Sequence, residues 1–255
     1  MSTKKTFFAL TLCVLFAFQA FSQSQFKVFL FTKTAGWHHP SIHDGVNAMR
    51  NLAERHNFDL VWEENADRCF TENFLKDFDV VVFLNTTADV LNDDQQKVFE
   101  KFIQSGKGYV GIHAASDTEY DWPWYNQLVG KMFKIHPAQQ TAMIDVADYN
   151  FPGMEVFPKR FMWTDEWYEF KKENYSEVNV LLTLDETTYK PYAKWGDNVG
   201  EGMGYHPIAW YHNFDGGRSF FTGLGHISSV YSEPWFLQHL YGGIYWAATG
   251  KGIKE

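Results

Sequence analysis

The chain has 255 residues, enough to bury one large core, and it carries 22 Lys and Arg against 31 Asp and Glu. The resulting net charge of −9 argues against nucleic acid and anionic membranes as partners. Aromatic residues make up 18% of the chain, and many stand beside Asp, His or Gly, which favours a concave site for a polar, ring-shaped ligand. Individually, most of these aromatics would also suit a large core.

Residues 1–22 have the pattern of a secretory signal peptide. Lys4 and Lys5 precede the apolar run FFALTLCVLFAF, and the small residues of Ala20-Phe21-Ser22 follow it. The run is shorter than the roughly 20 residues that span a bilayer, so we expect a cleaved signal and no membrane association afterwards. The sequence therefore predicts a periplasmic or secreted protein with a single domain over 23–255. Its one remaining cysteine, Cys69, allows no internal disulfide.

The first half of the chain alternates β-rich and amphipathic segments, the pattern of parallel βα units. Strands are predicted at 26–31, 58–63, 79–84 and 109–113, and helices from residue 42 and over 92–106. The strands at 26–31 and 79–84 are apolar on both faces, as buried parallel strands must be. This half predicts an α/β fold with a mostly parallel sheet.

From about residue 138 the pattern becomes β-rich with little helix. Strands are predicted at 142–146, 179–184, 207–212 and 218–224, where they would extend or cap the sheet, with Gly216-Gly217 in a hairpin turn. A final helix is expected after Ser232, which would cap it, and Gly250 would end it.

Ligands bind at the carboxyl ends of the strands in an open parallel sheet, so the residues that follow each predicted strand are the informative ones. Histidines and other polar residues collect at these ends: His38, His39, His43, Asn85, His113, Asp117 and His226. His39 and His43 could face one another as metal ligands, or could be neutral residues near a helix end. His136, which precedes a proline, could fold over the site or merely turn the chain.

Two carboxylates lie between tryptophans in the segment MWTDEWYEF. Asp165 and Glu166, flanked by Trp163 and Trp167, are candidates for shifted pKa values and acid or base catalysis, although they could also be solvated loop acids. Asp117 follows His113 by four residues, where it could orient the imidazole or bind a cation. The sequence lacks HExxH, CxxC, GxSxG and a phosphate-binding glycine loop, which leaves cofactor-free or metal-aided chemistry.

Four ordered motifs resemble the ThuA-like, or trehalose utilisation, family: FTKTAGWHHPSI; GKGYVGIHAASDTEYDWPWYNQLVG with FKIHP; DEWYEF; and HPIAWYHNFDGGRSFFTGLGH. The resemblance implies a three-layer, flavodoxin-like fold similar to the class I glutamine amidotransferases. In those enzymes a cysteine, a histidine and a glutamate form the triad. Here His113 takes the place of the cysteine, His226 matches the histidine, and Ser228 stands where the glutamate would be. Cys69 lies between the second and third predicted strands, away from this elbow in the chain order, so the comparison argues against a thiol-based glutaminase or peptidase.

The resemblance also implies a part in carbohydrate catabolism, in which sugars are oxidised to 3-keto forms. One hypothesis is an enzyme for a glycoside or 3-keto-sugar, with His113 and His226 as acid and base. The remaining candidate catalytic residues are Asp117, Asp165 and Glu166. A metal variant would place a divalent ion such as zinc on some of His38, His39, His113 and His226.

The predicted ligand is a small carbohydrate. Its contacts are expected from Trp37, His38, Asn85, Tyr120, Trp122, Trp167 and His136. The alternative hypothesis is a non-catalytic sugar-binding module on an amidotransferase-like fold. The exact substrate, the reaction and the oligomeric state stay open at this point.

Overall fold

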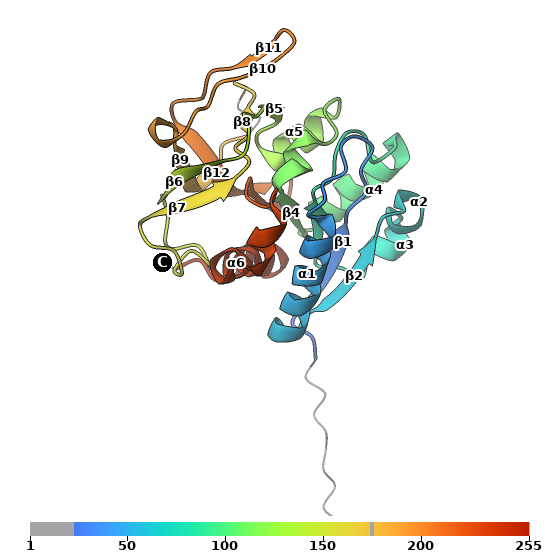
Figure 1. Ribbon diagram of the computed structural model, residues 1–255. Coiled ribbons are helices and arrows are strands. Elements are labelled where there is room, and N and C mark those ends of the chain that lie inside the picture. The colour runs from blue at the N-terminus through green and yellow to red at the C-terminus, as the bar shows by residue number, and fades with distance from the viewer. Residues whose placement is uncertain (1–22, 174–175, 255) are drawn as a thin grey trace, which may run out of the picture.

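The computed structural model describes residues 23–173 and 176–254, which form an α/β fold built around one large sheet (Figure 1). The strands of this sheet are β1 (Lys27–Phe31), β2 (Asp59–Glu63), β3 (Val80–Leu84), β4 (Gly108–Ile112), β6 (Gln140–Val146), β7 (Arg160–Asp165), β9 (Asn179–Asp185), β12 (His206–Phe214) and β13 (Gly217–Thr222). Their spatial order is β2-β1-β3-β4-β13-β12-β9-β6-β7.

The sheet changes from parallel to antiparallel at β13. The strands from β2 to β13 pair in parallel, and those from β13 to β7 pair antiparallel. The predicted α/β class is therefore confirmed, and the β-rich second half extends the sheet. The predicted hairpin turn is also present, since β12 ends at Phe214 and β13 begins at Gly217.

Helices cover both faces of the parallel half and complete a three-layer fold. One face is covered by α1 (Ile42–His56) and α6 (Pro234–Thr249), and the other by α2 (Ala66–Cys69), α3 (Glu72–Leu75), α4 (Asp93–Gln104) and α5 (Pro123–Val129). Alternate side chains of β1 enter the two cores, because successive residues of a strand point to opposite faces. Val28 and Leu30 pack with α1 and α6, whereas Phe29 and Phe31 pack on the other side.

Two small sheets lie outside the main one. They pair β5 (Phe133–Ile135) with β8 (Glu169–Phe170), and β10 (Ala193–Trp195) with β11 (Asn198–Gly200). The β10–β11 hairpin projects at the top of Figure 1. These strands have only two or three residues, too few for a periodic pattern, and the sequence did not predict them.

The predicted cap of α6 is wrong. Glu233, and not Ser232, is the N-cap residue, and Pro234 occupies the first position of the helix. Proline suits this position because its fixed φ matches the helix and its missing N–H would be unpaired there. Gly250 ends the helix in a left-handed conformation (φ 69°), as predicted.

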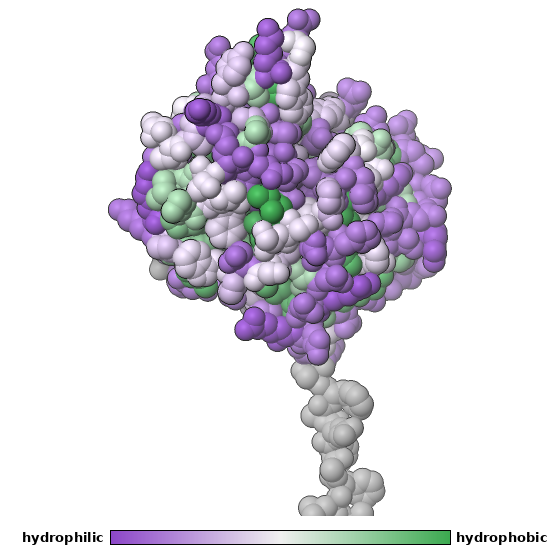
Figure 2. All heavy atoms as spheres, in the orientation of Figure 1, coloured by the Kyte–Doolittle hydropathy of each residue, from purple (hydrophilic) through white to green (hydrophobic). Residues whose placement is uncertain are grey.

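The predicted signal peptide, residues 1–22, lies outside the described residues. Among the helices of the described part, none combines the length and apolar character needed to span a bilayer. On the face in Figure 2 hydrophilic side chains predominate, and hydrophobic ones form only small, scattered patches.

His239 is buried in α6 between the rings of Phe157 and Phe220, and neither of its ring nitrogens has a hydrogen-bond partner among the described residues. Because an unpaired buried polar group is destabilising, we expect His239→Leu to raise the free energy of unfolding at pH 7 by about 1–3 kcal/mol. Urea unfolding measures this change. As a control, His212→Leu should destabilise the protein, since the buried His212 ring donates from Nε2 to the Leu128 carbonyl at 2.9 Å.

The same histidine gives an expected pH dependence. Burial lowers the pKa of His239 to about 3 in the folded protein, from an ordinary value of 6.5. The unfolded chain therefore binds a proton that the folded one rejects, and stability falls as the pH drops from 6.5 towards 3. His239 alone should lower stability by about 2 kcal/mol between pH 7 and pH 5, and His239→Leu should remove that part of the loss. An equal loss in both proteins would contradict this assignment.

Candidate functional site

His113 lies at the elbow where β4 ends and a short 3-10 turn (His113–Asp117) begins. Its backbone has φ 49°, in the left-handed region that non-glycine residues seldom adopt and that often marks functional sites. Nδ1 lies 2.9 Å from the Gly223 carbonyl, which can only accept, so Nδ1 carries a proton. In the neutral ring the lone pair is therefore on Nε2.

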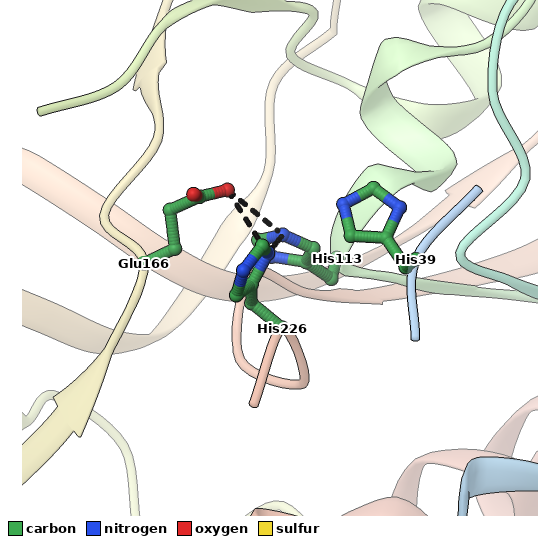
Figure 3. A group of neighbouring side chains, drawn as sticks. All are labelled: His39, His113, Glu166 and His226. Atoms are coloured by element: carbon green, nitrogen blue, oxygen red, sulfur yellow. Dashed lines mark hydrogen bonds and ion pairs between the residues drawn. The ribbon is translucent and has the colours of Figure 1, made fainter. Parts of the chain in front are cut away.

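Nε2 of His113 meets two further groups that come from distant parts of the chain (Figure 3). It lies 3.2 Å from Nδ1 of His226, in the loop after β13, and 3.4 Å from Oε2 of Glu166, between β7 and β8. The third side of this triangle, from His226 Nδ1 to Glu166 Oε2, is 3.1 Å. We call His113, Glu166 and His226 the trio. Three polar atoms this close need a shared proton or a metal ion between them, because their lone pairs would otherwise repel one another.

Glu166 is ionised within the trio. Its burial opposes the charge, but the neighbouring His113 and His226 side chains outweigh burial and hold the pKa of Glu166 well below its usual range. His39 faces the two histidines edge-on, with ring centroids 5.3 Å from His113 and 5.1 Å from His226. The ligand atoms of these four residues all lie within 4.8 Å of one another, so this buried cluster could hold a metal ion.

His39 is a neutral member of the cluster. It is buried, and its Nδ1 has no hydrogen-bond partner among the described residues. Burial, with the nearby His113 and His226, lowers the pKa of His39 to about 2. A neutral imidazole with an unpaired nitrogen is the form that binds a metal.

Asp165 holds the loop that carries His226. It is buried, and its Oδ2 accepts the backbone N–H of Gly225 at 2.9 Å, while Oδ1 accepts those of His226 and Ile227 at 3.2 and 3.3 Å. Burial raises the pKa of Asp165. The residue was predicted to be catalytic, but the structure places it behind the site, where it positions His226.

Asn85 has a similar supporting place. Its amide donates to Ser41 Oγ at 3.1 Å and to the Gly225 carbonyl at 3.3 Å, and its Oδ1 accepts from the Ala114 backbone at 3.4 Å. Asn85 is fully buried and thus connects the start of α1, the His113 elbow and the His226 loop. It was expected to contact substrate, but it is not among the residues that line the cavity described below.

A cavity of about 450 Å³ opens beside the trio. Its lining consists of Trp37, His39, Asp117, Phe133, His136, Glu166, Tyr168, Trp195 and His226. Two larger grooves, of about 760 and 530 Å³, are lined by no histidine. The smaller cavity contains the imidazole and carboxylate groups that catalysis or metal binding would use, so we take it as the candidate site.

His136 presents a second oriented imidazole to the cavity. Its Nδ1 lies 2.8 Å from the Pro137 carbonyl and 3.1 Å from Oε1 of Glu166, two acceptors that place the proton on Nδ1. The lone pair of the neutral ring is then on Nε2. Burial lowers the pKa of His136, so that the neutral form prevails at pH 7.

Asp117 is the second carboxyl group of the cavity. Burial raises its pKa, although the Tyr120 hydroxyl, 2.5 Å from Oδ1, opposes the shift. Tyr120 itself does not line the cavity, and its hydroxyl donates a hydrogen bond to Asp117.

Tyr168 packs on His113 and on Phe133, with centroid distances of 4.2 Å in both cases. This wall fixes the His113 ring from one side.

The structure leaves several predicted residues outside the site. His38 and His43 are exposed and take no part in the cluster that contains the buried His39. Trp122 packs in the core with α4 and donates to Glu100 Oε1 at 3.0 Å, and Trp167 is buried in the other core. These residues were predicted because they stand next to site residues in the sequence. Neighbouring residues of a loop or strand point to different sides, so adjacency in the sequence does not place them in the site.

Three aromatic residues of the lining were missed. Tyr168 and Phe133 lie within the motifs DEWYEF and FKIHP, where their aromatic character was the only signal. Trp195 comes from the β10–β11 hairpin, and no feature of the sequence connects it with the other segments of the site.

The sequence model of the ThuA family, described as trehalose utilisation, matches residues 27–247. The chain belongs to the ThuA family. Two ThuA-like proteins of known structure share its fold, each at 19% sequence identity. The one from Bacteroides uniformis ATCC 8492 has a TM-score of 0.74 and covers 91% of this chain and 96% of its own. The one from Parabacteroides merdae ATCC 43184 has a TM-score of 0.70, with coverage of 90% and 92%.

More distant structures share the fold of this ThuA chain as well. A β-galactosidase from Bacillus circulans sp. alkalophilus matches at 13% identity with a TM-score of 0.55, over 87% of this chain and 31% of its own. No curated protein sequence matches the chain. At these identities the structural likeness concerns the fold alone.

The ThuA chain differs from a thiol-dependent amidotransferase in three dimensions too. Cys69 is buried in α2, its Sγ donates to the Asn65 carbonyl at 3.0 Å, and burial raises the pKa of the thiol to about 12. It does not line the cavity. The carboxylate next to His226 comes from Glu166 and not from the position of Ser228.

Proposed function

We propose that this protein is an exported enzyme of carbohydrate catabolism, which acts on a glycoside or 3-keto-sugar at the trio and is not a glutaminase. Membership of the ThuA family makes carbohydrate catabolism plausible. The observation that carries the enzymatic part is the convergence of His113, Glu166 and His226 on one point beside a cavity. We further propose that a divalent metal ion such as zinc occupies that point.

The spacing of the trio supports the metal. Four ligands about 2.1 Å from a tetrahedral zinc ion lie roughly 3.4 Å from one another. The three distances within the trio are 3.1, 3.2 and 3.4 Å. Imidazole and carboxylate are also the ligands that zinc and similar ions prefer. His39 is then available as a fourth ligand, or it stands beside a coordination position that stays open for substrate.

Outer contacts support the same assignment. His113 donates its other ring proton to the Gly223 carbonyl, and Oε1 of Glu166 accepts from His136. Protein ligands of metals commonly have such partners, which fix the tautomer of the histidine and orient the carboxylate.

The chain's own groups suit acid–base chemistry on a keto-sugar. A bound divalent ion would supply a Lewis acid that polarises a carbonyl. Nε2 of His136 is available as a base for the acidic C–H beside a ketone, and Asp117, with its raised pKa, is available as an acid. Elimination, isomerisation and hydrolysis can each use such a pair.

A sugar-binding module without activity is the second candidate. The observation that favours it is the exposure of two indole rings in the cavity wall, 68% for Trp37 and 47% for Trp195, which suits the faces of a sugar ring. Convergent polar groups with fixed tautomers favour catalysis over this alternative.

The test uses the purified mature protein. We expect about one equivalent of metal by elemental analysis, and consumption of 3-keto-disaccharides or their parent glycosides that stops on chelation and returns when Zn²⁺ is added. Glutamine should not be hydrolysed. Saccharide binding without turnover of any of these compounds would replace the enzyme with the binding module.

A further inference from the structure

The β10–β11 hairpin brings an aromatic ring to the cavity from outside the main fold. Trp195, at the end of β10, lines the cavity, and its ring meets His136 edge-on with centroids 4.7 Å apart. The turn that follows contains Gly196, with φ 60° and no atom within 4 Å of the place a Cβ would take. The tip of the hairpin is therefore open to solvent, as its projection in Figure 1 suggests.

The hairpin is fastened to the body of the protein both next to its turn and just after β11 ends. The Asn198 side chain donates to the Lys134 carbonyl at 2.9 Å, and the backbone N–H of Gly202 donates to Glu169 Oε2 at 2.9 Å. Glu169 is buried and also pairs with the Lys134 ammonium. These contacts place Trp195 beside the cavity before any ligand arrives, which lowers the entropy lost on binding.

The charge of the lining restricts the ligand. Among the described residues that line the cavity there are two carboxyl groups, Asp117 and Glu166, and no Lys or Arg. Phosphate and carboxylate groups are bound in proteins by Arg and Lys or by helix N-termini. Apart from a metal at the trio, the described lining therefore offers an anionic group no Lys or Arg partner. Nearby Lys134 is engaged by Glu169.

We propose that the cavity selects an uncharged saccharide, without phosphate or carboxylate, and that Trp195 binds one sugar ring by stacking on its apolar face. The volume of about 450 Å³ lies in the range of small-molecule sites, and the lining mixes aromatic faces with hydrogen-bonding groups. This inference rests on the proposed function for the identity of the site, but it concerns binding and holds for an enzyme and for a binding module alike.

The experiment measures binding by calorimetry to the mature wild-type protein and to Trp195→Ala, Trp195→Phe and Trp235→Ala. The probes are trehalose, 3-keto-trehalose and trehalose 6-phosphate. Trp235 is a matched control, since it is 40% exposed and lies in a separate groove. We expect Trp195→Ala to weaken binding of the neutral sugar at least about tenfold, Trp195→Phe to retain most of it, and Trp235→Ala to change nothing.

Several outcomes would overturn the inference. Equal or tighter binding of trehalose 6-phosphate would contradict the selection for uncharged sugars, and unchanged affinity in Trp195→Ala would contradict the stacking. Absence of binding to all three probes would refute both parts. If the neutral sugars bind through Trp195 but are never turned over, the inference stands and the proposed enzyme fails, so the two can be distinguished.

Discussion

His113→Ala is expected to abolish metal retention and to reduce turnover by about 10³-fold or more, while the fold persists. The substitution removes one corner of the trio and leaves only its other two members, His226 and Glu166, with His39 beside them. It also vacates the space between Tyr168 and the Gly223 carbonyl. Elemental analysis, zinc titration and single-turnover kinetics on a 3-keto-disaccharide measure the effects.

Glu166→Gln should have the same direction of effect, because an amide keeps the shape but loses the charge that draws a cation between the two histidines. His38→Ala is the matched control: His38 directly precedes His39 in the chain, yet it is exposed and absent from the cluster. It should keep full metal content and activity. A metal-loaded, active His113→Ala protein would refute the assignment of the trio.

Asp165→Asn is expected to destabilise the protein by about 3 kcal/mol or more and to lower activity through His226. Both carboxylate oxygens accept backbone N–H groups, and an amide retains only one acceptor oxygen. Its NH₂ group would face the N–H of Gly225 or those of His226 and Ile227. At this chain length the loss corresponds to about 6–12 °C in Tm.

Urea unfolding measures the stability of Asp165→Asn, and zinc affinity reports whether His226 is still in place. Asp145→Asn is the control, because Asp145 is partly exposed and its partner Arg160 lies at the surface, where ion pairs contribute little. If Asp165→Asn were as stable as wild type but inactive, Asp165 would be a catalytic residue, as the sequence pattern first indicated, and not a positioning one.

The sequence predicted the parallel half of the fold well because its signals are local. The strands at β1, β3 and β4 are continuous apolar runs, and α4 has both a helical period and a capping box at Asn92. Placing polar residues at the carboxyl ends of parallel strands predicted a group that included His38, His39, His43, His113 and His226, of which the structure brings together His39, His113 and His226. Topology alone, without side-chain contacts, predicts that convergence.

The partition of roles within the site required the tertiary structure. Asp165 and Glu166 are adjacent in the chain, yet their carboxylates have different partners. The Asp165 carboxylate accepts backbone N–H groups of the loop that carries His226, whereas the Glu166 carboxylate faces the histidine side chains. In sequence both are simply acids between tryptophans. Successive side chains at the end of β7 point to opposite sides, so the two carboxylates diverge. The residue types do not indicate which of the two points into the site.

The chain by itself thus determined the α/β class, the family motifs and the edge of the sheet at which the candidate site lies, because hydrophobic period and the residues after each strand are properties of short segments. Only the tertiary structure decided that Glu166 completes the trio, that Asn85 and Asp165 support it from behind, and that Trp195 reaches the cavity. Those facts depend on contacts between residues 29 to 140 positions apart, and no local sequence pattern indicates that such residues will meet.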